Sequence, residues 1–146
     1  MARRLTIRIG AHPAITITRQ ATRSERLVYI AKANKALKYP FGRSKIVYIG
    51  TTKEGVSRIA ASAAHQAREL LETHGVKSLE FFVVTCRPLQ RVKTWSKLEN
   101  GLLITFKHEF GTVPLGNTMG KNRSWRDELD YFTEGRLRSV IKRFSH

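Results

Sequence analysis

The stretch KIVYIG, residues 45–50, decides how this chain folds. Its four central residues, Ile46 to Ile49, form a short hydrophobic run of the length that a buried β-strand has. Gly50 and the two threonines after it predict a turn. From about Glu54 onward, hydrophobic residues recur at helical spacing. The sequence therefore predicts a buried strand, a glycine turn and a helix in direct succession.

Further strands and helices follow from the same two periodicities. Alternation of hydrophobic and polar residues, or a short hydrophobic run, predicts a strand, and hydrophobic residues three or four positions apart predict a helix. The expected strands are 5–9, 15–18, 27–30, 46–49 and 79–85, the first two forming an N-terminal hairpin, and the expected helices are about 54–74, 95–110 and 124–144.

Two connections carry expectations of their own. Residues 31–45 include Pro40, Gly42 and five basic residues, so we expect a solvated loop there, part of which could form a helical turn. Ser124 follows a loop rich in glycine and asparagine, and we expect it to be the N-cap of the last helix, which could be interrupted near Gly135.

The order of these elements indicates the fold class. Strands come first and helices later, which favours an α+β domain with a small, mostly antiparallel sheet flanked by helices. The length of 146 residues fits a single domain. Within it we expect an N-terminal hairpin extension at 1–25, a core at 26–118 and a C-terminal helical extension at 119–146.

The charge of the chain points to a polyanionic partner. Lys and Arg number 27 against 11 Asp and Glu, which gives a formal net charge of +16. Such an excess destabilises a compact fold through self-repulsion, but it favours nucleic-acid binding, because each neutralised phosphate releases condensed counterions. A ribosomal-type RNA binder and a protein that is merely very soluble remain open as alternatives.

The cellular setting is also constrained. The longest hydrophobic runs are far shorter than the roughly 20 residues that span a bilayer, so no membrane association is expected. The basic N-terminus has no hydrophobic stretch behind it, which argues against a secretory signal. Cys86 is the single cysteine and is expected in the core. Without a disulfide framework, the expected location is a reducing compartment, the cytoplasm.

One helix face collects polar residues beside the expected glycine turn. Arg58, Ser62, His65 and Glu69 fall at i, i+4, i+7 and i+11 of the helix expected at 54–74. Arg58 lies in its first turns, where the helix N-terminus favours anions and a guanidinium can bind phosphate oxygens in bidentate fashion. His65 is as compatible with a solvated histidine as with a catalytic one.

Five features in this order resemble the GIY-YIG nuclease family. Tyr48-Ile49-Gly50 matches the second signature tripeptide, and Leu27-Val28-Tyr29 stands where the first is expected, with Leu27 in place of the glycine. Arg58 follows Tyr48 by ten residues, Glu99 lies on the later helix, and Pro114-Leu115-Gly116-Asn117 resembles the closing Pro-x-x-Asn. The resemblance covers about 26–118. The segments between the two tyrosines and between Glu99 and Asn117 are longer than in compact members.

The resemblance implies a catalytic site for phosphodiester hydrolysis. Glu99 would hold one Mg²⁺ or Mn²⁺, a hard cation suited to an oxygen ligand. Arg58 would stabilise the transition-state charge, and Tyr48 would hydrogen-bond the phosphate or its water. Tyr29 would be the general base, a role for which free tyrosine, with a pKa of about 10, needs cations nearby. Asn117 would brace the site, and His65 is a further catalytic candidate.

The predicted function is therefore a divalent-metal-dependent endonuclease that acts on DNA, RNA not being excluded. The main alternative is a non-enzymatic basic nucleic-acid-binding protein, either a degenerate nuclease domain or a ribosome-associated protein. The last helix is expected to pack on the domain or to form a homodimer contact. The residues expected to contact the nucleic-acid backbone are Lys32, Lys35, Lys38, Arg43, Lys45, Lys121, Arg123 and Arg126.

Overall fold

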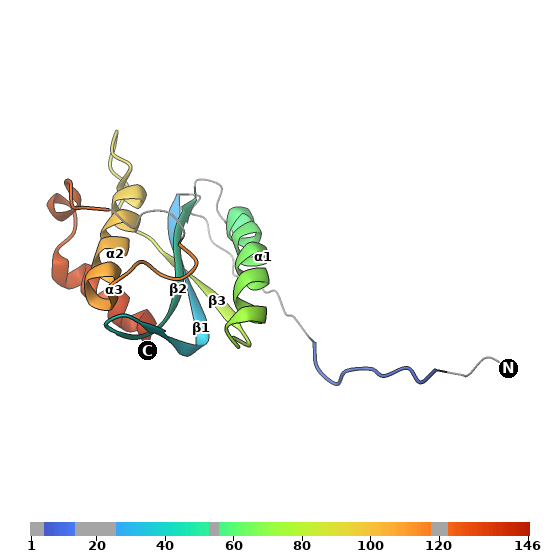
Figure 1. The fold of residues 1–146 in the computed structure, drawn as a ribbon. Helices are drawn as coiled ribbons and strands as arrows, with labels where there is room; N and C mark the ends of the chain where they lie inside the picture. Colours follow the sequence, from blue (N-terminus) through green and yellow to red (C-terminus); the bar gives the residue numbers. More distant parts are fainter. Residues whose placement is uncertain (1–4, 14–25, 53–55, 118–122) are drawn as a thin grey trace.

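A computed structural model describes residues 5–13, 26–52, 56–117 and 123–146 of the chain. It contains one three-stranded antiparallel sheet in the order β2-β1-β3, together with three α-helices (Figure 1). The expected α+β class is confirmed. The elements are β1 (Leu27–Tyr39), β2 (Gly42–Thr52), α1 (Val56–Thr73), β3 (Leu79–Val84), α2 (Thr94–Phe110), the short 3₁₀ helix η1 (Glu128–Asp130) and α3 (Glu134–Ser145).

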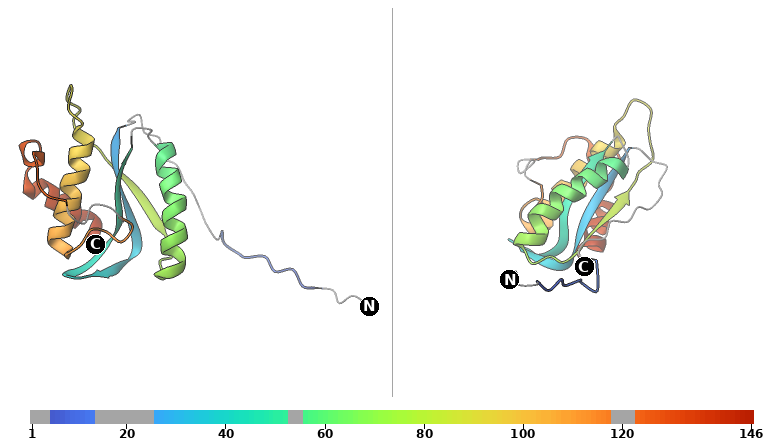
Figure 2. Two further views of the ribbon diagram at one scale, coloured as in Figure 1. Left: turned by 45° about the horizontal axis from the view of Figure 1, so that its top comes forward. Right: turned by 90° about the vertical axis from the view of Figure 1, so that its right-hand side faces the viewer.

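The sheet forms the middle layer of three. Helix α1 covers one face, while α2 and α3 cover the other (Figures 1 and 2). Successive side chains of a strand point to opposite faces. In β1, accordingly, Leu27 and Tyr29 join Ile59 of α1 in a small cluster, whereas Val28 and Ile30 belong to the larger core shared with α2 and α3. Both faces of the sheet are therefore buried around β1.

The long connection expected at 31–45 is instead part of a β-hairpin, so the prediction of a solvated loop is wrong. Strands β1 and β2 continue to a tight turn at Pro40-Phe41, with Tyr39 paired to Gly42. Tyr39 is buried, and its hydroxyl donates to the carbonyl of Ile46 at 2.7 Å. The pairing register shifts twice between Ala31 and Leu37. These irregularities break the alternation from which a strand is predicted.

The N-terminal hairpin expected from 5–9 and 15–18 is not confirmed. Residues 5–9 form no strand, and their hydrophobic side chains Leu5, Ile7 and Ile9 are about nine-tenths exposed. Figure 2 shows this segment running away from the body of the protein. Residues 15–18 lie outside the described part of the chain.

The first two expected helices and the strand at 79–85 are confirmed to within a few residues. Gly75, with φ of +64°, follows α1, and Gly111, with φ of +86°, caps α2 by donating to the carbonyl of Lys107. The expected start of the last helix is wrong. Its N-cap is Thr133, whose hydroxyl accepts from the Arg136 amide, and Ser124 lies in an irregular segment before η1.

None of the helices in the described ranges has the length and hydrophobicity that a membrane span requires.

Candidate active site

Two tyrosines from neighbouring strands form the centre of the candidate site. Tyr29 pairs with Gly50 across β1 and β2, so Tyr48, two positions along, is a diagonal neighbour of Tyr29 on the face that α1 covers. The ring centroids lie 5.7 Å apart at 35°. The Tyr29 hydroxyl lies 2.6 Å from Oγ of Ser62 on α1. Three neighbouring side chains with hydroxyl groups, Tyr48, Tyr29 and Ser62, thus lead from the edge strand β2 to helix α1.

Gly50 makes room for both tyrosine rings. It is not part of a turn, as the sequence predicts, but lies inside β2 opposite Tyr29. A Cβ added at this position would lie 2.5 Å from Cε1 of Tyr48 and 2.7 Å from Cζ of Tyr29. Both distances are too short for carbon atoms in contact, which prefer 3.5–4.0 Å. The missing side chain therefore allows the rings to pack over the strand.

Groups of opposite charge affect the pKa of Tyr48. Its pKa is raised, first by burial, then by its interaction with Tyr29 and the nearby charge of Glu99, against the opposing effect of Arg58. Arg58 is exposed in the first turn of α1, whereas Glu99 comes from α2 beyond the other face of the sheet. Both charges act on one phenol. The raised pKa keeps Tyr48 protonated, as a hydrogen-bond donor, at neutral pH.

Glu99 is a largely buried carboxylate, and the ion pair that it makes within the described part of the chain is loose. Its side chain is 15% exposed, and burial raises its pKa although Arg123 acts to lower it. Nη2 of Arg123 lies 3.7 Å from Oε1 of Glu99, longer than the 2.7–2.9 Å of a charge-assisted hydrogen bond. Burial penalises the charged form of this carboxylate, and the guanidinium of Arg123 compensates only in part. Such a carboxylate is suited to bind a divalent cation.

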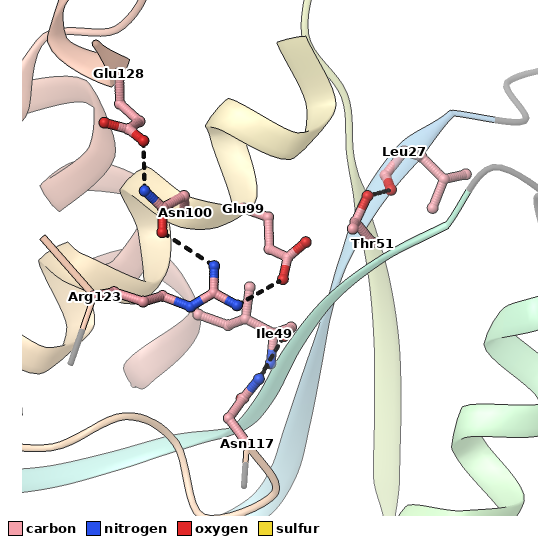
Figure 3. A network of polar contacts seen from close by, with 8 residues as sticks. All are labelled: Leu27, Ile49, Thr51, Glu99, Asn100, Asn117, Arg123 and Glu128. Carbon is pink, nitrogen blue, oxygen red and sulfur yellow. Dashed lines mark hydrogen bonds and ion pairs between the residues drawn. The ribbon is translucent and has the colours of Figure 1, made fainter. Parts of the chain in front are cut away.

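A polar network fixes Arg123 beside Glu99 (Figure 3). Nη1 of Arg123 donates to Oδ1 of Asn100 at 3.0 Å. The Asn100 amide donates in turn to Oε1 of Glu128, whose other oxygen accepts from the Arg126 backbone amide at 2.7 Å. Arg123 therefore belongs to the surroundings of Glu99 rather than only to the basic surface expected from the sequence.

Asn117 binds the outer edge of β2. Its amide group accepts from the Ile49 N–H at 3.0 Å and donates to the Ile49 carbonyl at 2.8 Å (Figure 3). One residue earlier, the Gly116 N–H donates to the Val47 carbonyl at 2.7 Å. The segment closes an edge that would otherwise expose unpaired backbone groups. It holds the strand that carries Tyr48.

Several predicted residues lie apart from this cluster. His65 is exposed on α1, and the described contacts of the two tyrosines do not include it. Lys35, Lys38, Arg43 and Arg126 are exposed, Lys32 and Lys45 are half-buried, and Lys121 lies outside the described residues. The five residues from Lys32 to Lys45 follow the hairpin away from Tyr29, and Arg43 donates to the Ala36 carbonyl.

The sequence assigns no role to Ser62, and it places Arg123 only among the residues expected to contact the nucleic-acid backbone. Ser62 follows Arg58 by four residues, and this i, i+4 spacing predicts that the two side chains share one face of the helix. Arg123 is 24 positions from Glu99, and the sequence carries no signal that pairs them. The contacts of Ser62 with Tyr29 and of Arg123 with Glu99 arise from tertiary packing.

Among the residues that the structure describes, no three His, Cys, Asp or Glu side chains gather in a group that could hold a metal ion. The expected site uses a single carboxylate, so it would not form such a group. Comparison of the chain with protein-family models, with curated proteins and with solved structures finds no significant match in any of the three.

Proposed function

We propose that this protein is a divalent-metal-dependent endonuclease of the GIY-YIG type that hydrolyses phosphodiester bonds in DNA. The observation that carries the proposal is the convergence on Tyr48. The Tyr29 ring packs against it, and the charges of Arg58 and Glu99, from opposite sides of the sheet, both act on it. Ordinary strand packing explains neighbouring tyrosines, but it gives no reason for a largely buried carboxylate and an arginine whose charges both affect Tyr48.

Each side chain in the proposed site has a role that its chemistry allows. Tyr48, kept protonated, donates a hydrogen bond to a phosphate oxygen or to the attacking water. As a phenolate, Tyr29 would take a proton from that water and become a neutral phenol, and a hydrogen bond from the Ser62 hydroxyl would stabilise the phenolate before the transfer. Arg58, exposed beside them, binds the phosphate and stabilises the charge that develops on it.

Glu99 would hold the metal ion, Mg²⁺ or Mn²⁺, which when bound polarises the phosphate and favours ionisation of a bound water. Burial in the absence of a metal makes the charged carboxylate unfavourable, so a divalent cation would stabilise it. Asn117 contributes indirectly, by holding Ile49 and thereby the neighbouring Tyr48 in place.

The substrate follows from the charge and the family resemblance. A net charge of +16 favours a polyanion, and the exposed basic residues Lys35, Lys38, Arg43 and Arg126 would contact the backbone without reading sequence. The choice of DNA over RNA rests on the resemblance. We further propose a reducing, cytoplasmic setting, from the single free Cys86, and a homodimer contact through the C-terminal helix as an option for assembly.

The test compares two glutamates of α2. Supercoiled plasmid and single-stranded DNA are incubated with Mg²⁺ or Mn²⁺ and wild type, Glu99→Gln or Glu109→Gln. Glu109 is an exposed glutamate of the same helix, ten residues further on, and pairs with Arg138. Metal-dependent nicking that is lost in Glu99→Gln but retained in Glu109→Gln is the expected result. Equal nicking by both variants would remove Glu99 from the site.

The alternative is a basic nucleic-acid-binding protein without catalysis. The ion pair of Glu99 with Arg123 favours it, because it places a cation of the protein next to the expected metal ligand. Under this alternative, wild type and both variants bind DNA with the same salt dependence, and none of them cleaves it with either metal.

A further inference from the structure

Arg123 is held in place more firmly than a surface arginine needs to be. Asn100 accepts from its Nη1, and Asn100 itself is bound to Glu128, which is 3% exposed. Burial acts to raise the pKa of Glu128, but hydrogen bonds from the Arg126 amide and Asn100 outweigh it and leave the pKa below its usual value. The network thus ends in a fixed, ionised carboxylate.

The position of Arg123 is not explained by pairing with Glu99 alone. At 3.7 Å the contact is an ion pair without a close hydrogen bond, so donors on Nη2 remain available for another acceptor. Nε of Arg123 is buried and has no hydrogen-bond partner among the described residues. A buried unsatisfied donor costs roughly 1–3 kcal/mol. An arginine kept in place at that cost is a candidate for a functional role.

We propose that Arg123 binds the scissile phosphate of the substrate, as a second arginine of the active site opposite Arg58. This inference rests on the proposed nuclease function and adds a binding residue to it. Arg123 lies beside Glu99, so a phosphate bound at the Glu99 metal also lies within reach of Nη2. Asn100 and Glu128 are positioning residues that set the orientation of the guanidinium plane.

The two arginines then act from different parts of the fold. Arg58 approaches from α1 on one face of the sheet, and Arg123 approaches from the segment beyond α2 on the other. A second guanidinium at the phosphate would add to the charge compensation that the transition state requires. The side chain of Arg123 is 32% exposed, so its outer part is accessible to a ligand.

The experiment uses a matched pair of arginines. Arg123→Met is compared with Arg138→Met. Arg138 of α3 pairs with Glu109, which lies on the same helix as Glu99, and removing Arg138 changes the charge equally. About 15 Å of helix separates Glu109 from Glu99. Three quantities are measured: single-turnover cleavage of a 20-base-pair duplex with Mn²⁺, binding of the same duplex in Ca²⁺ over a range of NaCl concentrations, and Mn²⁺ affinity without DNA by electron paramagnetic resonance.

The expected result is a loss of cleavage in Arg123→Met but not in Arg138→Met. Single-turnover cleavage by Arg123→Met falls about 10²-fold or more, and the slope of log K against log salt decreases by about one. Mn²⁺ affinity does not weaken. Arg138→Met cleaves at the wild-type rate. Asn100→Leu, which leaves Arg123 present but unsupported, shows an intermediate loss of cleavage, as expected of a positioning residue.

Two outcomes would overturn the proposal. One is a wild-type cleavage rate in Arg123→Met together with tighter Mn²⁺ binding and lower thermal stability, which would make Arg123 only a counter-ion of Glu99. The other is a salt slope unchanged from wild type. If Arg123→Met does not fold, Arg123→Lys keeps the charge but not the planar fork, and its cleavage is expected to fall at least tenfold. A wild-type rate in Arg123→Lys would equally refute phosphate binding by the guanidinium.

The failure of the proposed function has a separate signature. A wild type that cleaves no nucleic acid, while the salt slope still falls by about one in Arg123→Met and not in Arg138→Met, would refute the nuclease and retain Arg123 as a phosphate-binding residue.

Discussion

Replacing Gly50 with alanine tests the geometry of the candidate site directly. The new methyl group would lie 2.5 Å from Cε1 of Tyr48, 2.7 Å from Cζ of Tyr29 and 2.8 Å from the Tyr29 hydroxyl oxygen. The Tyr29 ring is held in place, because it is 2% exposed and its hydroxyl binds Ser62. The half-buried Tyr48 ring packs against it. Tyr29 cannot move away without breaking its hydrogen bond, and a shift of Tyr48 changes its packing on Tyr29, so we expect Gly50→Ala to displace both phenols.

The expected cost follows from two opposing effects. Overpacking of a well-packed region costs about 1–3 kcal/mol, whereas replacing glycine by alanine within a strand gains about 0.5–1 kcal/mol of conformational entropy. The net loss of stability therefore lies between about 0 and 2.5 kcal/mol, which lowers Tm by up to about 10 °C in a domain of this size. Misplacement of the phenols by about 1 Å would lower cleavage by about 10²-fold.

Urea denaturation at pH 7 measures the first effect, and single-turnover cleavage measures the second. Gly135→Ala is the matched control, because it lies in the first turn of α3 and a Cβ there meets nothing within 4 Å. We expect this control to be stabilised by up to about 1 kcal/mol. If Gly50→Ala proves as stable as wild type and cleaves normally while Gly135→Ala behaves as expected, the close packing of the two tyrosines over Gly50 is refuted.

Three further predictions concern stability. Asn117→Ala should lose about 1–3 kcal/mol and speed hydrogen exchange at the Ile49 amide, which Asn117 accepts from; unchanged exchange would argue against this contact in solution. Burial raises the pKa of Tyr39 to about 12, so the stability that its neutral hydroxyl provides is complete below pH 10 and is lost as pH rises through 12. In urea denaturation from pH 9 to 11.5, the advantage of wild type over Tyr39→Phe should therefore shrink, and a constant difference would contradict the raised pKa. Thr133→Ala should cost about 1 kcal/mol in thermal unfolding, whereas Ser124→Ala should cost almost nothing; the reverse order would restore Ser124 as the helix cap.

The fold class and most elements could be predicted from the sequence because local patterns are strong in them. The hydrophobic run at 46–49 and the helical stripes of α1 and α2 each reflect burial of one continuous face. The hairpin at 31–45 could not be predicted, since its register shifts interrupt the alternation of side chains. Pro40 and Gly42 mark a two-residue turn there, although their composition equally fits a long loop.

The sequence suggests the residues of the candidate site, but their contacts could not be predicted from it. Gly50 looks like a turn residue because glycine beside threonines is common in turns, yet its role depends on two rings that pack over it. Asn117 contacts Ile49 across 68 positions, and Arg123 contacts Glu99 across 24. Contacts at such separations depend on how the layers pack, which no local pattern contains.

Asn117 and Arg123 fasten the chain on both sides of residues 118–122, the first to β2 and the second to α2. Changes in sequence between these two anchors leave both contacts in place, because each contact is made by the side chain of the anchor itself. Evolution, or a protein engineer, therefore has a short stretch here that can be diversified next to the candidate site without endangering the scaffold. Selection for new substrates could begin in those five positions.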